Sequence, residues 1–347
     1  MTIDEAMKLA ENTLSAYNWT FLPSILKYAP SQRGQFQVSM LILNIRYQFD
    51  LDYAKNMNSP SMKNASYEAY NNEEKAFKVY LICELNKGLM KLDSYYRNSL
   101  ILPLFGLKNR VEELSFSFLP QDYYSGHPVE SCSRSDNRDL LLYRDDYMCR
   151  ATGRYDLELG VMAFDGVAGD SRYWLVIDAH AHDHLVSADY LQAAHVIPYS
   201  LNNFDKTKPE EYQVIWKTLQ EFSGFNLSTL KGKLINDDSN MLMLCPTAHK
   251  MHDDLRLSFS PVPSQFNRFK VNIFGELAGW FGLVKDETTT LEVKDNKSTV
   301  DKGINSNYLA IHHAICVILE KSGIYGELKK ERKIEYIEME KEYIYGN

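Results

Sequence analysis

The sequence predicts an α+β fold, with a mostly helical N-terminal region (residues 1–140) followed by short strands mixed with helices. Three patterns favour this class. Apolar residues recur at three- and four-residue spacing over residues 76–92, the stripe of an amphipathic helix. Short apolar or alternating segments follow in the middle of the chain, where they predict strands. Pro246 marks the start of a further helix there.

Length and composition bound the class of protein. With 347 residues the chain can bury a sizeable core and form two domains, and its 45% hydrophobic and 12% aromatic content is typical of globular proteins. The N-terminus lacks the basic and apolar regions of a secretory signal, and no apolar run approaches the ~18 residues that span a bilayer. We therefore expect an intracellular protein, cytoplasmic or nuclear, with no membrane partner. Its oligomeric state is not predicted.

Polar segments mark the expected loops. Residues 56–65 are polar and contain Pro60, and residues 123–137 are predicted to be the linker to the second domain. Residues 286–302 are predicted to form a charged loop. The last region, residues 286–347, is expected to contain this loop and the C-terminal helices. The five scattered cysteines indicate neither a disulfide framework nor a zinc knuckle.

Regular elements are expected in four further segments. Residues 209–222 predict a helix that starts at Pro209 and packs its apolar side on the strands and helix of the middle region. Residues 255–259 and 269–274 alternate like strands and are expected to pair. Residues 308–319 predict a buried helix.

The helix at Pro246 carries a candidate metal site. Because a helix turns by ~100° per residue, His249 and Asp253, four residues apart, project from one face. An imidazole and a carboxylate so placed can hold a divalent metal ion. His252 lies to the side of this face and is a possible third ligand or second-shell partner.

A second candidate group lies about fifty residues upstream. His195 ends a short apolar strand that Pro198 stops, so its imidazole is held rigidly and could take a proton from water. The amide of Asn240 offers both donors and acceptors and could brace the intervening loop. A base beside a metal ion is the arrangement expected for metal-assisted hydrolysis.

These segments resemble the HNH nuclease family. The chain reads A-A-H-V-I-P-Y-S at residues 193–200 and S-N-M-L-M-L-C-P-T-A-H-K-M-H-D-D at residues 239–254. This is similar to the A-A-H-I-x-P, N-G-L-x-L and H-x-x-F-D segments of a variant common in fungal and bacterial proteins. The upstream C-R-A-T-G at residues 149–153 resembles the C-x-x-T-G that opens the family's domain.

The resemblance implies a ββα-metal (HNH) finger within a nuclease-like domain at residues 141–285. It implies that His195 is the general base, Asn240 the middle Asn, His249 a catalytic and metal-binding residue, and Asp253 the second metal ligand. The implied activity is hydrolysis of DNA phosphodiester bonds with a divalent metal, Mg²⁺ before Mn²⁺, Ni²⁺ or Zn²⁺. The implied partner is DNA.

The chain departs from the family pattern at three positions. Ala194 stands where many members place a metal-binding Asp or His before the base, which leaves the metal fewer protein ligands. His252 replaces the phenylalanine, and Met241 replaces the glycine after the Asn. The alternative is therefore a catalytically degenerate HNH fold that serves as a nucleic-acid or protein binding module.

A different class is indicated by D-A-H-A-H-D-H at residues 178–184. Alternation puts His180, His182 and His184 on one side of a strand, as in the first metal motif of amidohydrolases. A (β/α)₈ barrel needs about 250 residues, however, and only 163 follow His184. An exposed face of an inserted hairpin is favoured, and an accessory metal or phosphate contact comes next.

The net charge of −8 gives no general attraction to DNA. A nuclease of this charge would need a local basic patch, for which the middle region offers six residues. They are Lys231, Lys233, Lys250, Arg256, Arg268 and Lys270. The sequence allows both readings, a patch that binds DNA weakly or scattered solvated charges.

Overall fold

The computed structural model describes residues 2–15, 19–58, 67–106, 138–158, 188–202, 209–230, 232–265, 267–275, 288–290 and 303–333. The chain divides into two compact units. The helical unit comprises Met1–Gly126, Lys206–Asn226 and Lys321–Asn347, and the mixed unit comprises His127–Asp205 and Leu227–Glu320. Each unit is therefore assembled from segments that are separated along the sequence.

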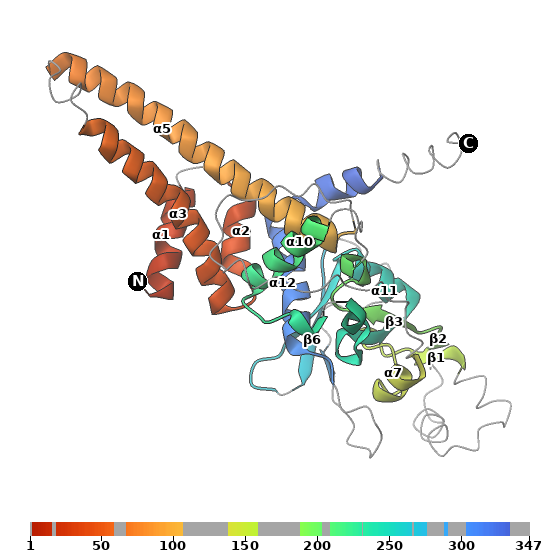
Figure 1. Cartoon of the computed structure of the whole chain (residues 1–347). Helices are drawn as coiled ribbons and strands as arrows, with labels where there is room; N and C mark the ends of the chain where they lie inside the picture. Colours follow the sequence, from red (N-terminus) through yellow and green to blue (C-terminus); the bar gives the residue numbers. More distant parts are fainter. Residues whose placement is uncertain are drawn as a thin grey trace. The chain divides into compact units, whose positions relative to one another are not determined.

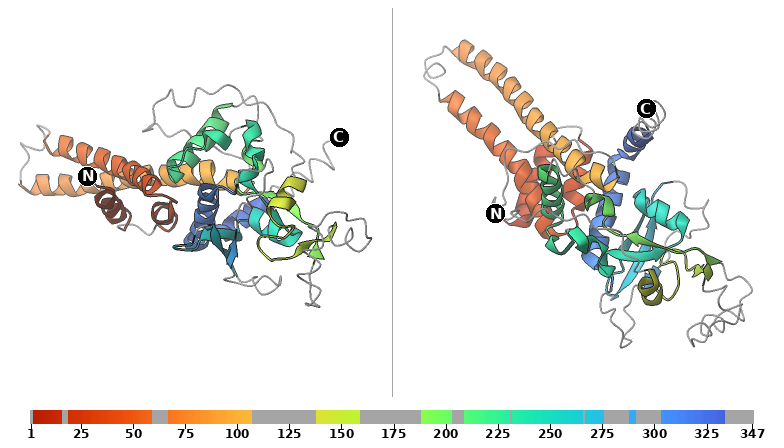
Figure 2. Two further views of the ribbon diagram at one scale, coloured as in Figure 1. Left: turned by 90° about the horizontal axis from the view of Figure 1, so that it is seen from below. Right: turned by 45° about the vertical axis from the view of Figure 1, so that its right-hand side comes forward.

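The described elements of the helical unit are all helices (Figure 1). They are α1 (Ile3–Ser15), α2 (Phe21–Tyr28), α3 (Gln32–Met57), α5 (Tyr67–Tyr96), the π-helix η1 (Arg97–Ile101), α6 (Leu102–Leu104) and α10 (Pro209–Ser223). Residues 325–333 are helical as well. The long helices α3 and α5 lie side by side in all three ribbon views (Figures 1 and 2).

The amphipathic stripe predicted for residues 76–92 lies within α5. Leu85, Leu89 and Leu92 are buried, whereas Met90, which the predicted stripe included, is 57% exposed, so the stripe was wrong at this position. Side chains 76–81 lie outside the described residues, so the stripe is otherwise confirmed for its second half.

Helix α10 forms over the predicted residues, but its predicted packing partner was wrong. It contacts α3 and η1 within the helical unit. Gly34 of α3 allows this close approach, because a Cβ there would collide with the backbone of Phe222. The Ser31 hydroxyl also donates to the carbonyl oxygen of Ser223 at 2.6 Å. Such contacts between distant segments cannot be read from the order of elements.

Within its described residues, the mixed unit contains three small sheets and several helices. Its strands are β1 (Tyr155–Asp156), β2 (Ala188–Asp189), β3 (Gln192–His195), β4 (Met241–Leu244), β5 (Leu257–Pro261), β6 (Arg268–Ile273) and β7 (Thr288–Thr290). Its helices are α7 (Arg138–Arg144), η3 (Tyr199–Asn202), η4 (Ser228–Leu230), η5 (Gly232–Asn236), η6 (Asp238–Asn240), α11 (Pro246–Asp253) and α12 (Ser306–Ser322). The mixture of helices and small sheets agrees with the predicted α+β class.

Strand pairing brings the two sequence motifs together. Strand β3 runs antiparallel to β4, with His195 opposite Met241 and Gln192 opposite Leu244. Strands β1 and β2 are parallel, and β5, β6 and β7 form an antiparallel sheet, which confirms the expected pairing of β5 with β6. The register fixes His195 beside the start of β4, directly after Asn240.

Helix α11 begins where the sequence predicts. Cys245 is its N-cap residue in extended conformation, and Pro246 occupies the first turn, where its missing N–H is not needed. Because β4 ends at Leu244, a single residue separates the strand from the helix. The candidate residues therefore lie on β3 and α11 or directly before β4.

Helix α12 covers the predicted buried segment and extends it by a few residues at each end. In the described ranges no helix is both long and apolar enough to cross a membrane. Two expected loops were wrong where the structure describes them, since residues 288–290 form β7 and α3 extends to Met57. The rest of these two segments, and the expected linker at residues 123–137, lie outside the described residues or carry no regular element.

Candidate metal and catalytic site

The exposed side of α11 presents an imidazole next to a carboxylate. His249 Nε2 lies 3.5 Å from Asp253 Oδ2, with side-chain exposures of 22% and 51%. The spacing of four residues on one helix accounts for this proximity. The structure therefore brings together the two residues that the sequence suggests as metal ligands.

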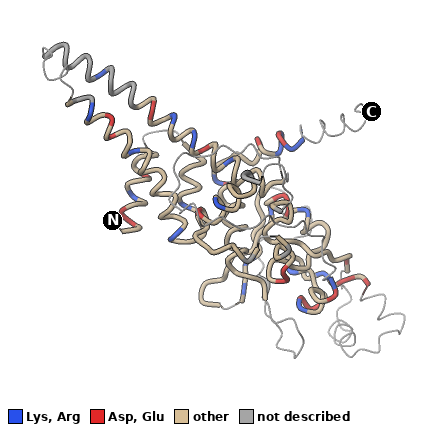
Figure 3. The backbone as a smooth tube through the Cα atoms, viewed as in Figure 1, with Lys and Arg blue, Asp and Glu red and all other residues tan. Residues whose placement is uncertain are grey.

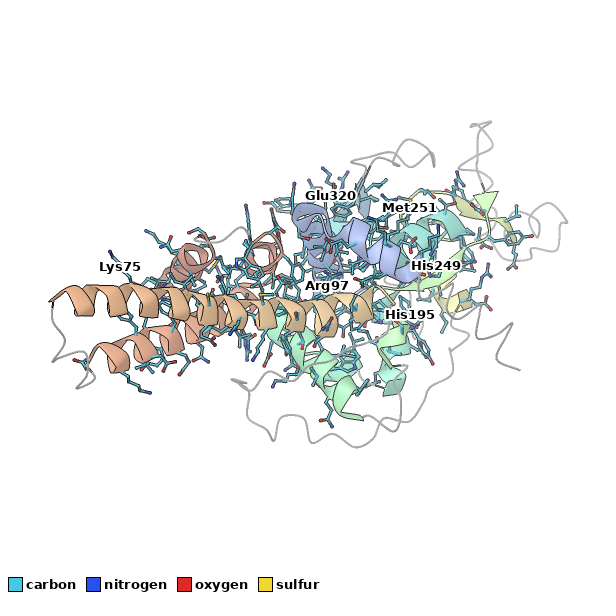
Figure 4. All side chains as sticks on the ribbon, turned by 90° about the horizontal axis from the view of Figure 1, so that it is seen from above. Lys75, Arg97, His195, His249, Met251 and Glu320 are labelled. Carbon is cyan, nitrogen blue, oxygen red and sulfur yellow. The ribbon has the colours of Figure 1, made fainter. Side chains whose placement is uncertain are left out.

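Each candidate histidine meets a side-chain amide oxygen of another element. His249 Nδ1 lies 2.8 Å from Oε1 of Gln192, the first residue of β3. His195 Nε2 lies 2.9 Å from Oδ1 of Asn236, the last residue of η5. These contacts orient both rings within the mixed unit. His195 and His249 are labelled in Figure 4.

Asn240 is fully buried and joins the end of β3 to η5. Its Oδ1 accepts a hydrogen bond from the Ile197 N–H at 2.9 Å, and its Nδ2 donates to the carbonyl oxygens of Ile197 at 3.0 Å and Ile235 at 2.9 Å. Its own carbonyl accepts from Val196 N–H at 2.8 Å. These bonds hold the turn that follows His195.

His252 lies in the core of the mixed unit and does not share the exposed side of α11. It is 1% exposed, and its ring stacks on that of His312 from α12 with centroids 3.8 Å apart. Burial, followed by the neighbouring His312, holds the pKa of His252 well below its usual value. The expectation of a third ligand at His252 is therefore corrected, because the ring is packed against α12, and its role as a second-shell partner stays a prediction.

The His249 and Asp253 donors fit a divalent ion in part. Two ligand atoms about 2.1 Å from one ion are about 3.4 Å apart at a tetrahedral angle, close to the observed 3.5 Å, and about 3.0 Å apart in the octahedral geometry of Mg²⁺, for which the two side chains would have to move closer. Nitrogen and carboxylate oxygen are both common donors for such ions. No group of three or more His, Cys, Asp or Glu side chains in the described ranges is placed to hold a metal. Water would have to complete the coordination.

Position 194 explains why the donor set is small. Strand alternation puts Ala194 on the same face of β3 as Gln192, and Gln192 contacts His249 of α11. Ala194 is fully buried and offers no donor. A metal-binding residue at this place, as many HNH proteins have, would face the same helix.

A buried ion pair anchors α7 to β4. Arg144 bonds to both carboxylate oxygens of Asp145 at 2.8 and 3.0 Å, and the two side chains are 3% and 4% exposed. Arg144 also donates to the carbonyl oxygens of Asp238 and Met241, and Asp145 accepts from the Met243 N–H. The pair satisfies backbone groups on both sides of Asn240.

Two thiols meet at the start of α11. A hydrogen bond with Cys149, together with one from the Ala248 N–H, lowers the pKa of Cys245 to about 6 despite burial. Thr152 Oγ1 lies 3.8 Å from the same sulfur. The turn C-R-A-T-G therefore packs on the N-terminus of the helix that carries His249.

The basic residues of the mixed unit do not all remain available to a phosphate. Lys250 Nζ pairs with Asp254 at 2.9 Å. Arg268 is exposed, and Arg256 and Lys270 are half-buried. Lys231 and the side chain of Lys233 fall outside the described residues. In Figure 3 blue and red segments are interspersed along the described chain, so the local patch remains a prediction.

The region that contains this site matches a known protein family. Residues 149–260 match the model of a family described as HNH endonuclease. This match covers His195, Asn240, His249 and Asp253, and it begins at Cys149. The segment of residues 149–260 is therefore similar to the HNH nuclease family. Searches of curated proteins and of solved structures found no match.

The sequence did not single out Gln192 or Asn236. Gln192 lies directly before the A-A-H segment, and Asn236 lies four residues before Asn240. Their proximity to the motifs is the one signal that could have drawn attention to them. The histidines at 180, 182 and 184 fall outside the described residues.

Proposed function

We propose that this protein is a metal-dependent endonuclease that hydrolyses DNA phosphodiester bonds. The observation that carries the proposal is the 3.5 Å approach of His249 Nε2 to Asp253 Oδ2 within the residues that match the HNH family. We further propose that β3, β4 and α11 form the ββα-metal arrangement of that family. The intracellular location, cytoplasmic or nuclear, that the sequence suggests is part of the proposal.

The proposed roles follow from the positions of the side chains. His249 and Asp253 would hold a divalent ion, for which Mg²⁺ is the first candidate and Mn²⁺, Ni²⁺ or Zn²⁺ are alternatives. Such an ion, when bound, neutralises charge that develops on the phosphodiester. His195 takes a proton from the attacking water. Asn240 holds the turn after β3, so that His195 keeps its position.

The low number of protein ligands is compatible with this function. Mg²⁺ usually keeps several water molecules and binds few carboxylates. The net charge of −8 predicts weak DNA binding that depends on a local patch and falls steeply with salt. The second candidate function, a binding module without activity, is favoured by the pairing of Lys250 with Asp254 and by the two-residue donor set.

The test is nicking of supercoiled plasmid by the full chain at low salt, with Mg²⁺, with Mn²⁺ and with a chelator. We expect nicking only with metal, and His195→Ala should lower its rate by about 10²–10⁴-fold, as expected for loss of a general base. His313→Ala is the matched control, because His313 lies in the same unit and bonds to Ser258 instead.

Thermal unfolding of each variant separates loss of chemistry from loss of fold. Equal nicking by wild type and His195→Ala, or nicking that persists in chelator, would contradict the proposal. Binding of the plasmid without nicking, with either Mg²⁺ or Mn²⁺ present, would favour the binding module.

A further inference from the structure

Two amide side chains meet the two candidate histidines at opposite ring nitrogens. Gln192 Oε1 lies 2.8 Å from Nδ1 of His249, whereas Asn236 Oδ1 lies 2.9 Å from Nε2 of His195. An amide oxygen only accepts hydrogen bonds, so the ring nitrogen facing it must carry the proton. The contacts therefore assign a protonated nitrogen to each ring, and the two assignments differ.

A neutral imidazole carries one N–H, so its other nitrogen bears the lone pair. In His249 the lone pair is on Nε2, the atom that faces Asp253 at 3.5 Å. In His195 the lone pair is on Nδ1. A metal ligand and a general base both require a lone pair, and each histidine offers it on a defined atom.

We propose that Gln192 and Asn236 are positioning residues that fix opposite tautomers, Nδ1–H in His249 and Nε2–H in His195. This inference rests on the proposed nuclease function for its consequences, but the tautomers themselves are independent of activity. Without either amide oxygen, the corresponding ring would exchange between tautomers and turn more freely. A fraction of molecules would then present an N–H to the metal or to the water.

Asn236 is held more firmly than Gln192. It is 6% exposed, and its neighbour Ile235 accepts a hydrogen bond from Asn240, which also binds both backbone groups of Ile197. Asn240 thus sets the distance between the end of β3 and η5, and with it the contact of Asn236 with His195. Gln192 is exposed at the start of β3. We therefore expect the larger effect at Asn236.

The direct test is nitrogen NMR of the full chain with isotope-labelled histidine, since protonated and unprotonated ring nitrogens have well-separated shifts. Signals of His195 and His249 are assigned by their loss in His195→Ala and His249→Ala. We expect Nε2–H for His195 and Nδ1–H for His249 in the wild type. Asn236→Ala and Gln192→Leu should each convert only the facing ring to a tautomer mixture. The opposite tautomer, or a mixture in the wild type, would overturn the proposal.

The consequence is tested in the plasmid assay and by Mn²⁺ binding. Asn236→Ala should slow nicking about 10–100-fold, and Gln192→Leu should weaken Mn²⁺ binding by a similar or smaller factor. Asn236→Asp and Gln192→Glu keep an accepting oxygen. They should therefore show the wild-type tautomers and recover much of the lost nicking rate and Mn²⁺ affinity. Asn236→Asp also covers the case in which Asn236→Ala does not fold.

Matched controls remove amides that bond elsewhere. Asn272→Ala removes a part-buried amide of β6 that donates to Ser260 of β5, and Gln35→Leu removes an amide that donates to the Lys27 carbonyl. Both should stay within about 2-fold of wild type in nicking and Mn²⁺ binding, as expected away from the site. If Asn236→Ala matches Asn272→Ala in tautomer and rate, Asn236 has no positioning role. If the tautomers agree with expectation but neither the wild type nor any variant nicks DNA, only the nuclease proposal fails.

Discussion

Burial shifts the pKa of carboxyl groups in the helical unit and of imidazole groups in the mixed unit. In the helical unit, burial raises the pKa of Glu221 to about 7 and that of Asp93 to about 6. In the mixed unit, burial lowers the pKa of His312 to about 4 and that of His252 well below its usual value. For these four groups burial favours the uncharged form, as the cost of desolvating a charge requires.

The stability of the two units should therefore depend on pH in opposite directions. A buried acid with a raised pKa keeps its proton when the unfolded chain has lost it, so the helical unit loses stability as pH rises from about 4.5 to about 7. A buried histidine with a lowered pKa stays neutral when the unfolded chain takes up a proton. The mixed unit therefore loses stability as pH falls from about 6.5 to about 4.

The histidines of the mixed unit also divide by environment. His252 and His312 are buried and stacked on each other, whereas His195 is half-buried and His249 is 22% exposed. His249 and His252 are three residues apart on the same eight-residue helix. The side of α11 on which a histidine lies therefore decides whether it serves packing or is available for chemistry.

The largest effect on stability is expected from the buried ion pair of the mixed unit. Arg144→Ala leaves the Asp145 carboxylate buried without its bidentate partner, which should destabilise this unit by about 3–5 kcal/mol. Hydrogen exchange resolved by segment should show faster exchange in α7, β4 and α11. The helical unit should keep its protection, which would separate the two units energetically.

Lys250→Ala is the control for this prediction. It removes a pair between side chains that are 68% and 22% exposed, so its cost should stay below about 1 kcal/mol. Equal effects of Arg144→Ala and Lys250→Ala would mean that burial does not govern these pairs.

The next effect is the acid sensitivity of the mixed unit. Lowering the pH from 7 to 4 should cost it about 3 kcal/mol through His312 alone, because its folded-state pKa of about 4 lies well below the unfolded value. Segment-resolved hydrogen exchange of α11 and α12 at several pH values measures this slope. In His312→Gln the slope should flatten, and an unchanged slope would show that other groups cause it.

The effect expected in the helical unit has the opposite sign and a similar size. Glu221→Gln should stabilise this unit by about 3 kcal/mol at pH 8 and little at pH 4, because the charged carboxylate no longer has to be desolvated. The amide can still accept from the Tyr95 hydroxyl, which lies 3.5 Å from Glu221 Oε2. Exchange in α10 and α5 at both pH values measures the difference. A loss of stability at pH 8 would contradict the raised pKa.

Local sequence patterns predicted the elements that depend on neighbouring residues. Pro246 indicated the start of α11, four-residue spacing put His249 beside Asp253, and the apolar run at residues 308–319 predicted α12. These features need only backbone geometry within one or two helical turns. The α+β class follows from the same patterns, since each element forms over nearly the residues expected.

Only the tertiary structure decided what these elements contact. The His195 contact with Asn236 joins residues 41 apart in sequence, and the His249 contact with Gln192 joins residues 57 apart. The placement of α10 on α3 and the burial of His252 against His312 depend in the same way on distant segments. Periodicity shows that a side chain lies on one face of a helix, but the partner of that face is set by how the whole chain packs.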